Sequence, residues 1–204
     1  MMPRIKICGL SRPADIDVIN EVRPDYAGFV FARSPRKVTA AQAQQLRELL
    51  EPGIIPVGVF VDAALEEVAT LAKAGAIEIA QLHGSENATY IEALKTRCDI
   101  PVIKALTVRT AADIEAADRT VADILMLDNG KGTGERFDWG FLKDAKRPTH
   151  PWFLAGGITT GNLEQALSLD PWGIDVSSGV EAQRGLKDPE MIRAFMDALR
   201  TLRG

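Results

Sequence analysis

Short apolar segments alternate with amphipathic segments from one end of the chain to the other. The apolar segments are rich in Val, Ile and Phe and are mostly apolar on both faces, which is typical of buried parallel strands. They predict eight strands, at residues 4–8, 26–31, 56–61, 77–82, 101–106, 123–127, 152–155 and 173–177.

Amphipathic segments with helical spacing lie between these strands. The last is the clearest, because Asp188 suits the N-cap and Pro189 suits the first helical position. The apolar residues of that segment, at positions 192, 195, 196 and 199, form one face of a helix. Asp62 is predicted to cap an earlier helix. Strands that alternate with helices in this way indicate parallel βα units.

Eight βα units fit either an open, doubly wound sheet or a closed barrel. Polar, glycine-rich segments follow several different strands, including the last two. In a barrel these strand ends converge on one mouth, so the pattern favours the barrel. Nothing in the chain resembles a linker or a low-complexity tract. We therefore predict an α/β protein with a single (β/α)₈ TIM-barrel domain over residues 1–204.

Charge and composition narrow the partners. The net charge of −4 disfavours nucleic acid, whose phosphates attract basic surfaces. No apolar run approaches the ~20 residues that cross a bilayer, so no membrane contact is expected. The N-terminus lacks a signal-peptide core, and the two cysteines are best interpreted as reduced thiols. A cytoplasmic monomer or homodimer is expected.

A thiol and a carboxyl group stand at the ends of two predicted strands. Cys8 ends the first strand, and Asp128 follows the sixth. A lone cysteine is more often a small buried hydrophobe, and an Asp after a strand is more often a turn residue. In an eight-stranded barrel, however, these two strand ends face each other across the mouth, with room for a sugar between them. Two groups so placed can act as a base and an acid.

Two glycine-rich segments follow the last two strands. Gly156 and Gly157 follow the seventh, and Ser178 and Gly179 follow the eighth. Glycine lets the backbone approach an anion closely and direct N–H groups at it. Tight turns are the commoner use of Gly-Gly, but these two loops form the usual phosphate site of barrel enzymes. The pair predicts a phosphate-binding site.

Other polar residues have less specific positions. Arg36 lies in a short basic cluster, where it can grip a carboxylate or simply face water. His83 ends the fourth strand and shares a face with Gln81, and Asp175 shares a face with Ser177. The chain has only two histidines and no ligand cluster around either, so no metal site is predicted.

Together these motifs resemble phosphoribosylanthranilate isomerases. They occur in the order seen in that family and cover nearly the whole chain. The matching stretches are Lys6-Ile7-Cys8-Gly9-Leu10, Gly28-Phe29-Val30-Phe31, Ser34-Pro35-Arg36, Gly58-Val59-Phe60-Val61, Gln81-Leu82-His83-Gly84, Gly132-Thr133-Gly134, Phe137-Asp138-Trp139, Ala155-Gly156-Gly157, Asp175-Val176-Ser177-Ser178-Gly179-Val180-Glu181 and Lys187-Asp188.

The resemblance implies a role for each candidate residue. Cys8 becomes the general base and Asp128 the general acid, with Arg36 near the anthranilate carboxylate. The glycine loops bind the phosphate of a small phosphosugar substrate, and His83 and Asp175 become pocket residues. No cofactor is implied. Two departures from the family pattern are a segment before Arg36 that is about one residue short, and a short loop after Asp128 that carries Lys131.

The implied reaction is an Amadori rearrangement of phosphoribosylanthranilate to its open-chain ketose isomer. An unperturbed thiol has a pKa of about 8.5, so the site is expected to favour the thiolate of Cys8 modestly. One alternative is the histidine-pathway isomerase, whose two-aspartate design is disfavoured by Cys8. A second is a non-catalytic phosphate-binding barrel, which would not require both Cys8 and Asp128.

Overall fold

A computed structural model describes residues 3–128, 139–144 and 146–203. Its strands are β1 (Arg4–Cys8), β2 (Tyr26–Val30), β3 (Ile55–Phe60), β4 (Ile79–Leu82), β5 (Val102–Thr107), β6 (Ile124–Asp128), β7 (Trp152–Leu154), β8 (Gly173–Val176), β9 (Glu181–Gln183) and β10 (Leu186–Lys187). Its α-helices are α1 (Pro13–Val22), α2 (Ala40–Leu49), α3 (Leu65–Lys73), α4 (Ala88–Arg97), α5 (Ala111–Ala117), α6 (Phe141–Asp144), α7 (Leu163–Ser168) and α8 (Pro189–Arg203). Two 3₁₀ turns are η1 (Thr160–Asn162) and η2 (Ser178–Val180).

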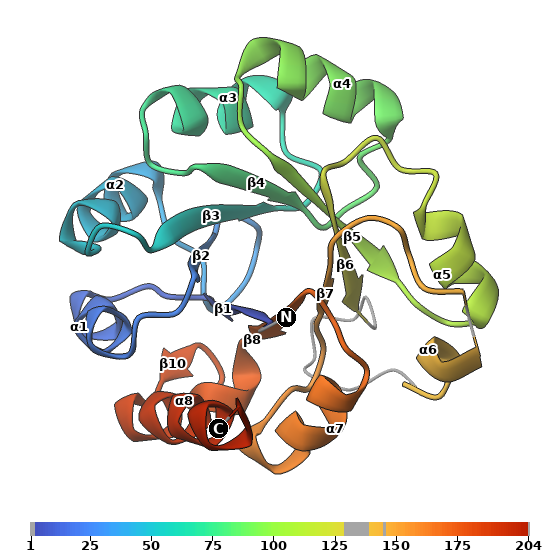
Figure 1. Ribbon diagram of the computed structural model, residues 1–204. Helices are drawn as coiled ribbons and strands as arrows, with labels where there is room; N and C mark the ends of the chain where they lie inside the picture. Colours follow the sequence, from blue (N-terminus) through green and yellow to red (C-terminus); the bar gives the residue numbers. More distant parts are fainter. Residues whose placement is uncertain (1–2, 129–138, 145, 204) are drawn as a thin grey trace.

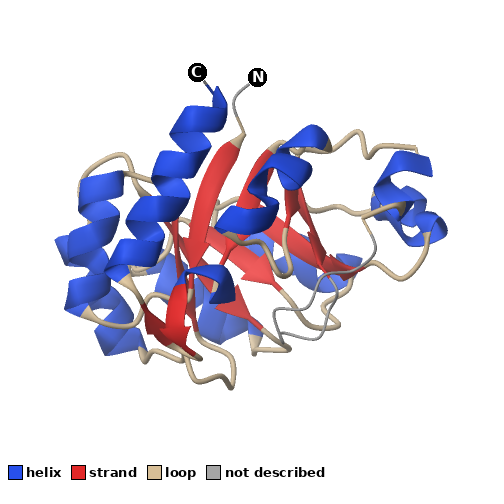
Figure 2. Cartoon of the chain, turned by 90° about the horizontal axis from the view of Figure 1, so that it is seen from below, coloured by secondary structure: helices blue, strands red, loops and turns tan. Residues whose placement is uncertain are grey.

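Strands β1 to β8 form a closed barrel in chain order, and each pairs in parallel with its neighbours. The barrel closes where β1 pairs with β8, with Lys6 opposite Asp175. The helices surround the strands on the outside (Figure 1), and in the perpendicular view the strands slant through the centre (Figure 2). This topology confirms the predicted (β/α)₈ fold, and the open doubly wound alternative is wrong.

The core has two main layers because strand side chains alternate between the helices and the barrel interior. Ile5 and Ile7 belong to the outer layer, where the strands meet the helices. The interior of the barrel is filled by a second cluster that includes Tyr26 and Phe153. The ring centroids of these two residues lie 5.6 Å apart in an edge-to-face contact. Polar side chains from the same strands lie nearer the carboxyl ends of those strands.

The last helix begins as its sequence predicts. The Asp188 carboxylate accepts hydrogen bonds from the backbone N–H groups of Glu190 and Met191, at 2.8 and 3.1 Å. Pro189 opens the helix, and Ile192, Phe195 and Leu199 are fully buried against the barrel. Among the described residues, no helix is both long and apolar enough to cross a membrane.

Candidate functional site

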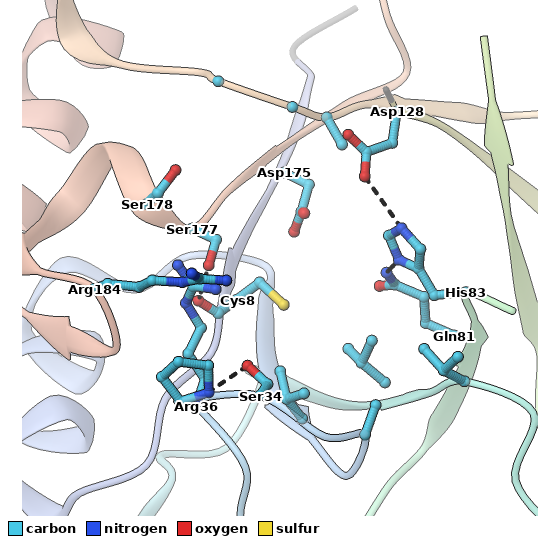
Figure 3. Close-up of a pocket in the computed structure, with 18 of the residues that line it drawn as sticks. Cys8, Ser34, Arg36, Gln81, His83, Asp128, Asp175, Ser177, Ser178 and Arg184 are labelled. Carbon is cyan, nitrogen blue, oxygen red and sulfur yellow. Dashed lines mark hydrogen bonds and ion pairs between the residues drawn. The ribbon is translucent and has the colours of Figure 1, made fainter. Parts of the chain in front are cut away.

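A cavity of about 400 Å³ opens at the carboxyl ends of the barrel strands. Its walls come from the ends of β1, β3, β4, β6 and β8 and from the loops after β2, β7 and β8. Gly179 lies outside its lining, and the other predicted site residues all face it: Cys8, Arg36, His83, Asp128, Gly156, Gly157, Asp175 and Ser178. Figure 3 shows the side chains of Cys8, Asp175 and Asp128 directed toward the centre of the cavity.

Cys8 is the last residue of β1, and its thiol faces the cavity (Figure 3). Gly28 on the neighbouring strand makes room for it, because a Cβ at Gly28 would lie 2.9 Å from the Cys8 sulfur. The Cys8 backbone carbonyl accepts a hydrogen bond of 3.0 Å from the Ser177 hydroxyl, which fixes the end of β1 to the loop after β8. The side chain is therefore held at the carboxyl end of the barrel.

Burial sets the protonation of Cys8. It raises the pKa of the thiol, the nearby Lys6 ammonium opposes this effect, and the Asp175 carboxylate adds to it. The net result is a pKa above the ordinary value. The expected modest preference for the thiolate of Cys8 is therefore wrong, because desolvation outweighs the attraction of Lys6.

Alkylation should report this raised pKa directly. In a Cys98→Ala background, the rate at which iodoacetamide modifies Cys8 is expected to keep rising to a higher pH than the rate for a free cysteine peptide, whose thiol has a pKa of about 8.5, because only the thiolate reacts. Mass spectrometry of the modified peptide gives the rate. A rate that levels off at the same pH as that of the free peptide, or at a lower pH, would contradict the raised pKa.

A buried ion pair lies in the barrel interior beside Cys8. The Lys6 ammonium is 2.7 Å from an Asp175 carboxylate oxygen, and the Lys6 side chain is fully buried. Burial alone would lower the pKa of Lys6, but the Asp175 carboxylate and the Cys8 thiol raise it above its ordinary value. Lys6 thus stays a cation in the interior and holds Asp175 at the edge of the cavity.

Asp128 ends β6 and faces the cavity with its carboxyl group. One of its oxygens lies 3.1 Å from the His83 Nε2. The other ring nitrogen of His83 lies 3.1 Å from the amide nitrogen of Gln81, which is 1% exposed. Strand β5 lies between β4 and β6, so the contact between His83 and Asp128 crosses one strand of the barrel. Figure 3 shows Gln81, His83 and Asp128 as a continuous chain along one wall.

Arg36 is held by an acidic partner that lies far away in sequence. Its Nε and one terminal nitrogen donate to the two carboxylate oxygens of Glu181, at 2.7 and 2.8 Å. The Lys187 ammonium also binds Glu181, at 2.6 Å. Burial alone would raise the pKa of Glu181, but the hydrogen bonds from Arg36 and Lys187 lower it to about 2. The remaining N–H groups of the Arg36 guanidinium can bind an anion in the cavity.

Sequence reasoning gave Glu181 no role, although it lies within a quoted motif. Arg184 was also missed, and it lines the same cavity from the turn between β9 and β10. In the sequence, the only feature that distinguishes Arg184 is the glycine that follows it, Gly185. That glycine has a φ of 87°, and a Cβ there would lie 3.0 Å from Pro35. The turn therefore packs directly on the loop that carries Arg36.

The two glycine-rich loops touch each other. Gly156 and Gly157 have φ angles of 83° and 66°, in the left-handed region that glycine adopts without strain. A Cβ at Gly179 would lie 1.9 Å from the Ile158 carbonyl oxygen, so the backbones after β7 and β8 are in direct contact. The two loops that the sequence assigns to one phosphate site are therefore neighbours in the fold.

Two further features of the sequence concern the loop after Asp128 and the residues that could bind a metal ion. The loop after Asp128, including Lys131 and the stretch Gly132-Thr133-Gly134, lies outside the described residues. Across residues 3–128, 139–144 and 146–203, no group of three or more His, Cys, Asp or Glu side chains could hold a metal ion. A thiol and a carboxyl group at the described cavity can transfer protons to and from a molecule bound there.

Comparison with known proteins agrees with this geometry. A family model for N-(5'phosphoribosyl)anthranilate (PRA) isomerase matches residues 5–198. The N-(5'-phosphoribosyl)anthranilate isomerase of Endomicrobium trichonymphae is 41% identical over 207 residues, covering 98% of this chain and all of the relative.

Solved structures give the same result. The phosphoribosyl anthranilate isomerase of Thermus thermophilus is 36% identical, with a TM-score of 0.91, over 98% of this chain and 100% of that one. A second phosphoribosyl anthranilate isomerase was solved in complex with reduced 1-(o-carboxyphenylamino)-1-deoxyribulose 5-phosphate. It is 30% identical, with a TM-score of 0.82, over 98% of this chain and 100% of that one. The chain therefore belongs to the N-(5'-phosphoribosyl)anthranilate isomerase family.

Proposed function

We propose that this isomerase of tryptophan biosynthesis converts phosphoribosylanthranilate to 1-(2-carboxyphenylamino)-1-deoxyribulose 5-phosphate with Cys8 as general base and Asp128 as general acid. The observation that supports these roles is that the two side chains end β1 and β6 and line the same cavity. A thiol and a carboxyl group on opposite walls can act on two neighbouring atoms of one sugar.

The reaction is a balanced internal rearrangement. Asp128 donates its proton to the ribose ring oxygen, the bond between that oxygen and C1′ breaks, and the anilino nitrogen lone pair forms an iminium. The Cys8 thiolate then removes the proton from C2′, and the electron pair moves to give an enolamine. The enolamine then tautomerises to the ketone, since C1′ gains one proton and the C2′ hydroxyl loses one. The proton on the Cys8 thiol returns through solvent to the Asp128 carboxylate, so both groups regain their starting forms. No electrons enter or leave, so the groups on the protein are sufficient.

The two ends of the substrate need separate anchors. Arg36 is proposed to bind the anthranilate carboxylate, since Glu181 fixes its guanidinium plane at the cavity wall. The loops at Gly156–Gly157 and Ser178–Gly179 are proposed to bind the phosphate with backbone N–H groups. His83 and Asp175 complete the pocket. The complex of a relative with a reduced phosphoribulose compound supports a phosphosugar ligand.

Neither alternative explains the same residues. The histidine-pathway reading does not account for a cysteine at the end of β1, and a non-catalytic barrel does not require the acid–base pair. We propose that the protein acts in the cytoplasm on a small-molecule substrate, as a monomer or homodimer.

Growth without tryptophan tests the proposed function. A bacterial strain that lacks its own isomerase should grow when it carries this gene, and the gene encoding Cys8→Ala should fail to restore growth at equal protein levels. Failure of the unaltered gene, with folded protein present, would overturn the proposed activity.

Substitutions at Arg36 and Lys37, in the basic cluster, should have graded effects on KM. Arg36→Ala should raise KM at least ~10-fold, because it removes the guanidinium that Glu181 fixes at the cavity wall and that is proposed to bind the substrate carboxylate. Lys37→Ala is the control, since Lys37 does not line the cavity. Arg36→Lys should restore binding only in part. Equal, small effects on KM for all three variants in steady-state assays would show that Arg36 does not bind the substrate carboxylate.

The phosphate site can be tested separately. Gly157→Val should raise both KM and the inhibition constant of inorganic phosphate at least ~10-fold. A β-branched residue is strained at a φ of 66°, and its bulk would fill the loop. Gly53→Val is a control for strain alone, since Gly53 also has a positive φ, 96°, but lies outside the cavity. If inorganic phosphate inhibited Gly157→Val as strongly as it inhibits the unaltered protein, the anion would bind at another site.

A further inference from the structure

Arg184 lines the cavity and has no role in the proposed reaction. It lies in the turn between β9 and β10, and its side chain extends along the cavity wall toward Cys8 (Figure 3). Its guanidinium forms no hydrogen bond or ion pair with another described residue. A guanidinium carries five N–H donors and a permanent positive charge. These donors are therefore available to a molecule that enters the cavity.

The turn that carries Arg184 is fixed to the Arg36 side chain by one carboxylate. The backbone N–H of Gly185 donates to a Glu181 oxygen at 3.1 Å, and the same oxygen accepts a hydrogen bond of 2.8 Å from Arg36. A Cβ at Gly185 would also lie 3.0 Å from Pro35, the residue before Arg36. The backbone at Arg184 is thus held beside Arg36, although the two residues are far apart in the sequence.

Positive charge exceeds negative charge at this part of the wall. Arg36 and Lys187 share the single carboxylate of Glu181, so these three side chains keep one net positive charge. Arg184 adds a second positive charge that no ion pair with a described residue neutralises. Like charges near a partly desolvated surface repel each other unless an anion lies between them. The wall therefore favours an anion that contacts both Arg36 and Arg184.

We propose that Arg184 is a second ligand of the substrate carboxylate and a residue that determines specificity for it. The two oxygens of a carboxylate offer about four lone-pair sites, so one carboxylate can accept hydrogen bonds from two guanidiniums. Arg36 supplies the N–H groups that Glu181 leaves free, and Arg184 supplies its own. The inference rests on the proposed function, in which the substrate presents its anthranilate carboxylate to Arg36.

The position of Arg184 favours the carboxylate over the phosphate of the substrate. The phosphate is proposed to bind backbone N–H groups of the loops after β7 and β8, whereas the Arg184 turn packs on the loop that carries Arg36. The planar guanidinium also matches the planar carboxylate, with which it forms two parallel hydrogen bonds. Arg184 should therefore increase the affinity only for phosphosugars that carry a carboxylate.

Two ligands that differ in the carboxylate test this inference. Reduced 1-(o-carboxyphenylamino)-1-deoxyribulose 5-phosphate carries both a carboxylate and a phosphate, whereas ribose 5-phosphate carries only the phosphate. Arg184→Gln should raise the Kd of the reduced compound about 10-fold or more, since a charge-assisted contact is lost. The Kd of ribose 5-phosphate should stay within about twofold of its value in the unaltered protein, because the phosphate contacts are intact. Isothermal titration calorimetry measures both constants without turnover.

Matched variants separate a specific contact from a general attraction for anions. Arg33→Gln removes the same charge from the lining of the same cavity and should raise the Kd of the reduced compound far less. Arg184→Lys should restore affinity only in part, because an ammonium lacks the planar pair of donors. Arg184 is exposed, so these substitutions remove no buried contact, and thermal unfolding should confirm that each variant is folded.

Three results would overturn the inference. The first is an unchanged Kd for the reduced compound in Arg184→Gln. The second is an equal loss of affinity for both ligands, which would assign Arg184 to the phosphate. The third is an equally large effect of Arg33→Gln, which would indicate a general attraction for anions. If the unaltered protein itself failed to bind the reduced compound, the proposed function would fail, and the inference about Arg184 with it.

Discussion

Replacing Cys8 with Ala, or Asp128 with Asn, is expected to lower kcat for phosphoribosylanthranilate at least ~100-fold, the usual cost of losing a positioned proton-transfer group. Both side chains face the cavity, and each variant removes a proton acceptor or donor with little change in volume. KM should change far less, because the phosphate and carboxylate anchors lie on other residues.

Matched variants separate chemistry from folding. Cys98→Ala removes the other buried thiol, which lies at the end of α4 and outside the cavity, and should leave kcat unchanged. Thermal unfolding should show that Cys8→Ala and Asp128→Asn remain folded. A folded Cys8→Ala protein with near-normal kcat would eliminate the thiol as the base.

Lys6→Met is expected to lower the free energy of unfolding by about 3–5 kcal/mol, the cost of leaving one member of a buried ion pair without its partner. Lys6 is fully buried and lies 2.7 Å from Asp175, whose side chain is 10% exposed. Met preserves most of the side-chain volume, so the loss is electrostatic rather than a cavity effect. Urea unfolding at pH 7 measures it.

The double variant gives the sharper test. Lys6→Met combined with Asp175→Asn should be more stable than the sum of the two single losses predicts, because the uncompensated charge is removed with its partner. Lys95→Met breaks a surface pair with Asp123 and should cost no more than ~1 kcal/mol. If Lys6→Met lowered the free energy of unfolding as little as Lys95→Met does, Lys6 and Asp175 would not be electrostatically coupled.

Local sequence signals predicted the fold well where one physical cause dominated. Buried parallel strands need apolar residues on both faces, and the predicted strands match the barrel closely. The predicted cap at Asp188 is confirmed, because its carboxylate accepts hydrogen bonds from free N–H groups in the first turn of α8. The predicted cap at Asp62 is wrong, since α3 begins after Ala64. The Asp62 carboxylate instead accepts hydrogen bonds from the backbone and hydroxyl of Ser85, at 2.7 Å each.

The candidate site was predictable only at the strand ends. Cys8 and Asp128 could be chosen because topology alone brings the ends of β1 and β6 to one mouth. The residues that hold the site side chains in place lie far from them in the sequence, and no periodic pattern relates the two. Arg36 and Glu181 are 145 residues apart, and Lys6 and Asp175 are 169 residues apart. The raised pKa of Cys8 depends on burial in the closed barrel, so the sequence could not reveal it.

The most direct test of the central claim is the rate at which the purified protein consumes phosphoribosylanthranilate, followed by the loss of that compound's fluorescence. The Amadori product should accumulate in equal amount with no added metal or cofactor, and Cys8→Ala and Asp128→Asn should each abolish most of the rate. A folded protein that leaves the fluorescence unchanged, or whose rate is unaffected by both substitutions, would contradict the account.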